Sequence, residues 1–321
     1  MKYQQIDLPV IDLSPLEDNL TNSSPEVLDQ ISKDIKLACT KYGAFYITSS
    51  SFKLEDQKLI LESSRKFFDL SESIKKKIPI KSGGFTRGYV GIGSESGSHR
   101  VEIKEAFSYG YEWKEGEKPT NPMQGQNEWG NLEQILGEEW CESLRRYYNQ
   151  MVHLTELVVN SLEVALGMEL KGYCKGGETI SVLRLFKYFP YENKEKEEST
   201  SEKIGCSPHT VLQPEDTQGL QMFYDNQWWD IPSKPVSFVV NCGDYLSLLT
   251  RGAYVYDCKF PEFNQDDDNK ALRSKELSLF QDQRADSNNG NENKLDLSEK
   301  CFGEATIIGD NNPGPMFALL K

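Results

Sequence analysis

Residues 206–260 constrain the fold more than any other stretch, because short runs of alternating apolar and polar residues follow one another there. The runs are Gly219–Tyr224, Trp228–Ile231 and Val236–Asn241, bordered by the turn sequences Asp-Asn, Pro-Ser and Cys-Gly-Asp. An alternation of period two, broken by turn residues, predicts antiparallel strands joined by tight turns. The stretch shows no 3.6-residue helical period, so we expect a β core in the last third of the chain.

The composition excludes several classes of partner. The chain has 321 residues, 37% of them hydrophobic, and a formal net charge of −14. This charge repels phosphates, so neither nucleic acid nor an anionic membrane is expected as a partner. No apolar run reaches the roughly 18 residues of a membrane span, and residues 1–12 are too polar for a signal peptide. The seven cysteines form no CxxC pair, which favours free thiols and a cytoplasmic location.

Helical patterns dominate the first half of the chain. Ser24 and Pro25 are an N-cap residue and a first-turn proline, so they predict a helix that continues to about Tyr42. A second helical stretch covers residues 54–77, and we expect its closing lysines to be a solvated helix end. Residues 132–170 have apolar side chains at steps of three and four, which predicts a long amphipathic helix.

Several further motifs follow one another along the chain. They are the strand-like runs 7–13, 43–47 and 182–190, the motif Lys104-Glu105-Ala106-Phe107 with Gly110, Asn127-Glu128-Trp129, His209-Thr210, Gly219-Leu220-Gln221, Val239-Val240-Asn241 with Gly243-Asp244, and Gly252 with Tyr254. Together they closely resemble the isopenicillin N synthase-like dioxygenases. Those enzymes use non-haem iron(II) and, in most members, 2-oxoglutarate. The resemblance extends from residue 7 to about residue 260.

The resemblance implies an α+β fold, with a double-stranded β-helix (jelly roll) core and flanking helices from the N-terminal half. It implies an N-terminal dioxygenase-like region at 1–175, the β-helix core at 176–285 and a divergent tail at 286–321. The implied cofactors are Fe(II) and 2-oxoglutarate. The implied reaction is oxidation of a small organic substrate by hydroxylation, desaturation or ring closure.

The metal ligands that the resemblance implies are incomplete here. The family holds iron(II) with two histidines and one carboxylate on one face. His209 has the position of the first histidine, but Val211 stands where the carboxylate is expected. About six residues of the family's pattern are missing after Thr210, and strand alternation does not let Val211 take over the role. The family's second histidine, expected a few residues after Tyr254, is also missing. The candidate replacement ligands are Asp216, or its neighbour Glu215, for the carboxylate and Asp257, or Cys258, for this histidine. The two remaining histidines, His99 and His153, are expected to have no role at the metal.

The 2-oxoglutarate site that the resemblance implies is also altered. The family clamps the cosubstrate with an Arg-x-Ser motif late in the β-helix, since a guanidinium matches a carboxylate. The matching segment here is Glu276-Leu277-Ser278, and a glutamate repels 2-oxoglutarate. Phe189 replaces the tyrosine before the strand proline, while Tyr188 is retained. Tyr188 and Ser278 are therefore the candidate cofactor-binding residues.

The motifs of the family's fold are present, but most of its metal ligands are missing. Three hypotheses follow from this conflict. The first is an iron(II) oxygenase with a rearranged ligand set. The second is a non-catalytic pseudoenzyme that uses the β-helix cavity as a small-molecule binding or interaction module. The third is a mis-spliced or degraded product of an active gene. We expect a member of the family that acts on a small molecule, with its oxidation activity weakened or lost.

Overall fold

The computed structural model describes residues 4–17, 24–80, 87–92, 104–118, 124–170, 181–189, 208–211, 220–225, 227–242 and 246. The predictions for Asp216, Asp257, Ser278 and the tail at 286–321 lie outside these residues.

The described helices are α1 (Ser14–Glu17), α2 (Pro25–Lys41), α3 (Leu54–Phe68), α4 (Glu72–Lys75), α5 (Leu132–Leu136) and α6 (Glu138–Leu166). The described strands are β1 (Gln4–Gln5), β2 (Val10–Asp12), β3 (Ala44–Thr48), β4 (Gly88–Val90), β5 (Lys104–Gly110), β6 (Val182–Tyr188), β7 (Pro208–Val211), β8 (Gln221–Tyr224), β9 (Gln227–Asp230) and β10 (Phe238–Cys242).

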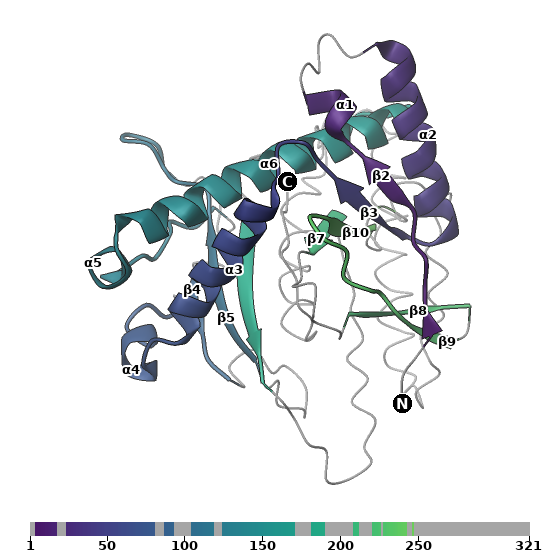
Figure 1. The fold of residues 1–321 in the computed structure, drawn as a ribbon. Helices are drawn as coiled ribbons and strands as arrows, with labels where there is room; N and C mark the ends of the chain where they lie inside the picture. The colour runs from purple at the N-terminus through teal and green to yellow at the C-terminus, as the bar shows by residue number, and fades with distance from the viewer. Residues whose placement is uncertain are drawn as a thin grey trace, which may run out of the picture.

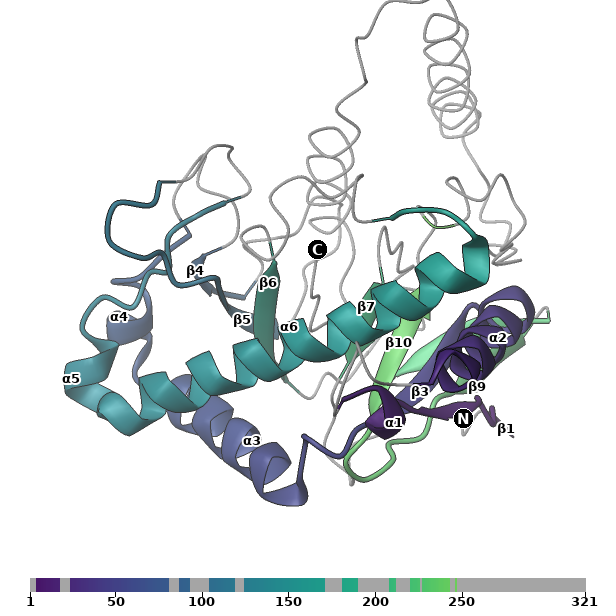
Figure 2. The same cartoon turned by 90° about the horizontal axis from the view of Figure 1, so that it is seen from above.

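The described strands form three small sheets. Sheet A has the order β1-β9-β8, sheet B the order β2-β3-β10-β7, and sheet C the order β4-β5-β6. Sheet C lies with α3 and α4 at one end of the molecule, and sheets A and B lie with α2 at the other (Figure 1). Helix α6 runs from the first end to the second in both views (Figure 2). The strands and helices together confirm the α+β class.

Sheet B is covered on both faces, because the side chains that its central strands point to either face are apolar. In β3, Phe45 and Ile47 join the main core with the helices, whereas Ala44 and Tyr46 pack against sheet A. Strand β10 alternates in the same way. Successive side chains of a strand point to opposite faces, so an unbroken apolar run is suited to a sheet that lies between two layers.

The three strands predicted in the last third of the chain are present, but one expected pairing is wrong. Strands β8 and β9 form an antiparallel hairpin, as the alternation predicts. Strand β10 does not continue that sheet, because it pairs with β3 and β7 in sheet B. Pro232 and Pro235 lie in the β9–β10 connection, and proline has no N–H to donate to a ladder. The connection therefore crosses from one sheet to the next.

The start of α2 confirms the capping prediction. The Ser24 side chain accepts a hydrogen bond from the Val27 N–H, and Pro25 occupies the first turn. The helix ends at Lys41, next to the predicted Tyr42, and it buries a stripe that includes Ile31, Ile35 and Ala38.

The other two helical predictions are confirmed with one break each. The stretch 54–77 divides into α3 and α4, and the stretch 132–170 divides into α5 and α6. Gly137, at the second break, has φ 91°, and Gly167, after α6, has φ 62°. Glycine adopts positive φ without the steric cost that other residues meet, so it stops a helix at little expense.

The lysine run at the end of α4 is not uniformly solvated, so that prediction is wrong for Lys75. Its side chain is 5% exposed and forms a 2.8 Å ion pair with Glu105 on β5. Lys76 does follow the prediction, since it pairs with Glu72 on the exposed side of α4. The two lysines differ because they lie on different sides of the helix end: Lys75 faces sheet C, and Lys76 faces solvent.

Among the described residues, none of the helices combines the length and hydropathy that crossing a membrane requires.

Candidate functional site

Strands β5 and β6 present a cationic and aromatic face on the side of sheet C away from the helices. The register pairs Lys104 with Tyr188, Ala106 with Phe186 and Ser108 with Arg184. The alternate residues of both strands, among them Phe107 and Leu185, join the core against the helices. Side chains that face each other across a ladder lie on the same side of the sheet. We call Lys104, Ser108, Arg184, Phe186 and Tyr188 the cationic face.

Two positive charges of the cationic face lie against one aromatic ring. The Lys104 Nζ atom is 5.1 Å from the centroid of the Phe186 ring, and the Arg184 Cζ atom is 4.9 Å from it. The Arg184 Nε–H donates to Ser108 Oγ at 3.0 Å. Tyr188, the sequence-predicted cofactor-binding residue, is 43% exposed at the end of β6. Guanidinium and ammonium groups beside an exposed phenol are suited to an organic acid.

The motifs pointed to this face only in part. Lys104 belongs to the Lys-Glu-x-Phe motif, but the motif alone does not show which residues of β6 lie beside it. The alternation of Val182–Tyr188 contains the missing signal, because Arg184, Phe186 and Tyr188 are spaced by two.

His209 lies on β7, where the backbone of sheet B positions it. It is the register partner of Asn241 on β10, and Val211 is the partner of Val239. The residue two positions after His209 is thus valine on the same short strand. His153 lies separately on α6 and is half-buried there, and His99 is outside the described residues.

No set of donors for iron(II) is assembled within the described part of the chain. In that part, no group of three or more histidine, cysteine, aspartate or glutamate residues lies close enough together to hold a metal ion. The site that the family implies needs two imidazoles and a carboxylate, and the described residues do not fit that requirement.

The Lys-Glu-x-Phe motif has a structural role that the sequence reasoning missed. Glu105 Oε1 accepts hydrogen bonds from Lys75 Nζ and from the Tyr89 hydroxyl, and Lys75 also donates to the Phe68 carbonyl oxygen at 2.9 Å. Burial and the hydrogen bond to Glu105 raise the pKa of Tyr89 well above its usual value. The buried pair therefore joins α3, α4 and sheet C.

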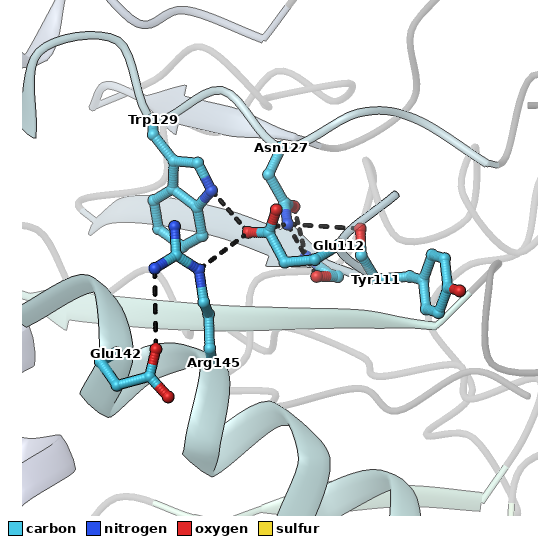
Figure 3. Close-up of polar contacts among 7 residues, drawn as sticks. Tyr111, Glu112, Asn127, Trp129, Glu142 and Arg145 are labelled. Atoms are coloured by element: carbon cyan, nitrogen blue, oxygen red, sulfur yellow. Dashed lines mark hydrogen bonds and ion pairs between the residues drawn. The ribbon is translucent and has the colours of Figure 1, made fainter. Parts of the chain in front are cut away.

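The Asn-x-Trp motif closes the end of β5 and connects it to α6 (Figure 3). The Asn127 side chain accepts from the Gly110 N–H at 2.7 Å and donates to the Gly110 carbonyl at 2.8 Å, as a neighbouring strand would. Glu112 Oε1 accepts from Trp129 Nε1 at 2.6 Å and from Asn127 Nδ2 at 3.0 Å. Arg145 of α6 lies 3.5 Å from the same carboxylate oxygen. The motif is thus explained by packing at the edge of sheet C.

Arg87 lies next to Gly110, the last residue of β5, and is buried with 1% of its surface exposed. Its Nη2 group donates to the Ser181 carbonyl oxygen at 2.9 Å. Burial lowers the pKa of the Arg87 guanidinium to about 10, so the group is still positively charged at neutral pH.

Three consecutive serines after β3 bind the carboxylate of Glu17 in α1. Ser49 and Ser50 donate their hydroxyls, and Ser51 donates both its N–H, at 2.9 Å, and its hydroxyl, at 3.0 Å. Partial burial alone would raise the pKa of Glu17, but the hydrogen bonds outweigh it and hold the pKa below its usual value. The serines therefore stabilise the ionised carboxylate.

Substituting Glu17 by glutamine is expected to destabilise the protein at neutral pH by about 1–2 kcal/mol, since ionised acceptors form the stronger hydrogen bonds. The pKa of Glu17 is lower in the folded than in the unfolded state. The contribution is therefore complete above the unfolded value, near 4.3, and is lost as the pH falls through the folded value. Urea unfolding at pH 7 and at pH 3 measures the difference. Glu115→Gln, at an exposed loop position, is the control and should change stability little at either pH.

Comparison with known proteins decides the family. The family model for the N-terminal part of non-haem dioxygenases, described as "non-haem dioxygenase in morphine synthesis N-terminal", matches residues 8–131. The model of the 2OG-Fe(II) oxygenase superfamily matches residues 179–260. The chain belongs to the 2OG-Fe(II) dioxygenase family. The resemblance read from the motifs is thereby confirmed.

Similar dioxygenases are known from fungi and plants. The chain is 26% identical over 268 residues to the 2-oxoglutarate-dependent dioxygenase caaD of Aspergillus niger, covering 79% of each chain. It is 27% identical over 270 residues to a homoarginine-6-hydroxylase of Glycine max, covering 77% of this chain and 78% of the relative.

Solved structures of related proteins share the fold. A full-length protein of Neurospora crassa, crystallised in complex with alpha-KG, matches with a TM-score of 0.63 at 19% identity, over 79% of each chain. A putative 2OG-Fe(II) oxygenase family protein of Caulobacter crescentus matches with a TM-score of 0.60 at 21% identity, over 77% of each chain. Likeness at this level of identity concerns the fold alone.

Proposed function

We propose that this dioxygenase-family protein binds 2-oxoglutarate or a related organic acid and that its oxidation of a small organic substrate is weakened or lost. One observation carries the proposal. The chain has three histidines, and Val211 stands two residues after His209 on β7, where the family pattern has a carboxylate. A single imidazole with no carboxylate at that position binds iron(II) weakly.

The proposed acid-binding site is the cationic face, in which Lys104 is 4% exposed and Arg184 is half-buried. Lys104 and Arg184 supply positive charge, and Tyr188 supplies a hydroxyl at its exposed end. A hydrogen bond between charged groups contributes about 1.5–3 kcal/mol, which is enough to select an acid over a neutral analogue. Ser278 is proposed as a second contact to the cosubstrate, and Asp216 and Asp257 as replacement ligands for any metal held near His209.

The remaining fold and domain assignments are proposed on the same basis. We propose that residues 176–285 complete a double-stranded β-helix around sheets A and B, and that residues 1–175 form the helical region that backs it. The two-sided core of sheet B supports the β-helix, since a jelly roll consists of two sheets packed face to face. Sheet B also takes β2 and β3 from residues 1–175, so the two regions share this sheet. Residues 286–321 are proposed as a separate tail.

Anaerobic titration with Fe(II), with and without 2-oxoglutarate, tests the loss of iron chemistry. We expect binding no tighter than millimolar and no visible charge-transfer band when the acid is added, because the donor set is incomplete. His209→Ala should remove any remaining binding, whereas His153→Ala on α6 should leave it unchanged. Stoichiometric micromolar binding with the band would show that the replacement ligands complete a functional iron site, and would contradict the proposed loss of iron chemistry.

A second titration tests the acid site independently of iron. Binding of 2-oxoglutarate to Arg184→Met should be about 10–100-fold weaker than to the unsubstituted protein, since a charge-assisted hydrogen bond is removed. Lys187→Met is the matched control. Lys187 lies on the same strand, but its Nζ atom pairs with Asp69 at 3.2 Å. Equal loss in both variants would point to general attraction of an anion and not to the cationic face.

A further inference from the structure

Two buried thiols from distant parts of the chain are in contact. The Sγ atoms of Cys39 and Cys242 are 3.0 Å apart, although the two residues are 203 positions apart in the sequence. Cys39 is 1% exposed and Cys242 is 5% exposed, and both are free thiols. A separation of 3.0 Å is about 1 Å longer than a disulfide bond, so little movement would close it.

Backbone pairing holds the two cysteines together. Cys39 lies in the last turn of α2, and the chain then turns through Gly43 into β3. Strand β3 pairs with β10 in a register that places Ala44 opposite Asn241. The next residue, Cys242, donates its N–H to the Gly43 carbonyl at 2.9 Å. The contact between the thiols is therefore set by the last turn of α2 and by a strand ladder, and both cysteines belong to the buried core.

We propose that Cys39 and Cys242 are a redox modification site at which hydrogen peroxide forms an internal disulfide. One thiol, as its thiolate, attacks the peroxide O–O bond, which gives a sulfenic acid and releases the first water. The second thiol attacks that sulfur, forms the S–S bond and releases the second water. Two thiols and one peroxide thus become one disulfide and two waters. A dithiol reductant reverses the step by thiol–disulfide exchange.

The surroundings make this a slow modification. The hydrogen bond with Cys39 and burial both raise the pKa of the Cys242 thiol well above its usual value. The thiolate is the reactive form, so a raised pKa slows the attack on peroxide. The disulfide should therefore form under sustained oxidation and not on brief exposure to peroxide.

The cross-link would join α2 to β10. Strand β10 also pairs with β7, the strand that contains His209. Closing a loop of 203 residues restricts the unfolded chain, so the oxidised form should be the more stable. We expect the thermal midpoint to rise by roughly 5–10 °C on oxidation.

Peptide mapping of the full chain tests the site. The folded protein is treated with hydrogen peroxide, denatured, alkylated, and digested with trypsin and Asp-N without reductant. The expected product joins residues 37–41 to residues 230–243, each of which contains a single cysteine. It should disappear after reduction. Recovery of both peptides in alkylated, unlinked form would overturn the proposal, as would a link from Cys39 to any other cysteine.

Thermal unfolding of variants gives a second readout. The rise on oxidation should be absent in Cys39→Ala and in Cys242→Ala. It should persist in Cys141→Ala, which removes a third buried thiol, on α6. If the variants do not fold, the peptide map of the unsubstituted chain still decides. Two thiols that merely pack as small apolar side chains would give neither the linked peptide nor the rise.

Discussion

Replacing Glu105 with alanine is expected to lower the free energy of unfolding by about 3–5 kcal/mol, because it leaves the buried ammonium of Lys75 without its counter-charge. The two groups are 2.8 Å apart, with side chains 5% and 7% exposed. The Tyr89 hydroxyl loses its acceptor in the same variant. Chemical denaturation at neutral pH measures the change. A cost below about 1 kcal/mol would show that water replaces the carboxylate and that the pair contributes little.

Two further variants separate the charge effect from packing. Lys75→Met combined with Glu105→Leu removes both charges and should recover most of the stability, since apolar replacements of a buried ion pair are often neutral. Lys76→Ala removes the neighbouring ion pair with Glu72, whose side chains are 64% and 68% exposed, and should leave the stability almost unchanged because water screens the pair.

Gly110→Ala is expected to destabilise the protein by about 3 kcal/mol or more, at or beyond the upper end of what over-packing costs. A Cβ atom at Gly110 would lie 2.3 Å from the Ser181 carbonyl oxygen and 2.4 Å from Arg87 Nη2. The carbonyl belongs to the backbone, and the buried guanidinium donates to it, so neither can move away without losing that hydrogen bond. Thermal and chemical unfolding would both report the loss.

Gly116→Ala is the matched control for this prediction. A Cβ atom at Gly116 meets nothing within 4 Å, but the residue has φ +85°. The cost there should be about 1–2 kcal/mol, from backbone strain alone. Similar losses in the two variants would mean that the contact at Gly110 relaxes and that close packing is not what requires glycine in the motif.

Local signals in the sequence predicted the elements that local chemistry determines. Ser24 and Pro25 start α2 because capping involves only neighbouring residues. The alternation of apolar residues likewise located β8, β9 and β10. It could not tell which strands pair, since β9 and β10 are close in sequence yet belong to different sheets. Pairing depends on β3, which lies almost two hundred residues earlier.

The residues of the candidate site were likewise predictable from the sequence only in part. Tyr188 and His209 were recognised from motifs, and the structure places them on β6 and β7. Lys104 and Arg184 became neighbours only through the register of β5 and β6, which no single motif specifies. Lys75 looked like one of three equivalent surface lysines, because the acid that pairs with it is thirty residues away.

Helix α6 contributes side chains to one continuous core that includes residues of both sheet B and sheet C. Trp140, near its start, lies against Phe67 and Phe107, and Tyr147, two turns later, contacts Phe52, which in turn contacts Phe238 of β10. Neither sheet can lose its covering without releasing the helix that covers the other. The two ends of the molecule are therefore expected to unfold as one cooperative unit, with amide protons in the middle of α6 exchanging with solvent only through that global opening.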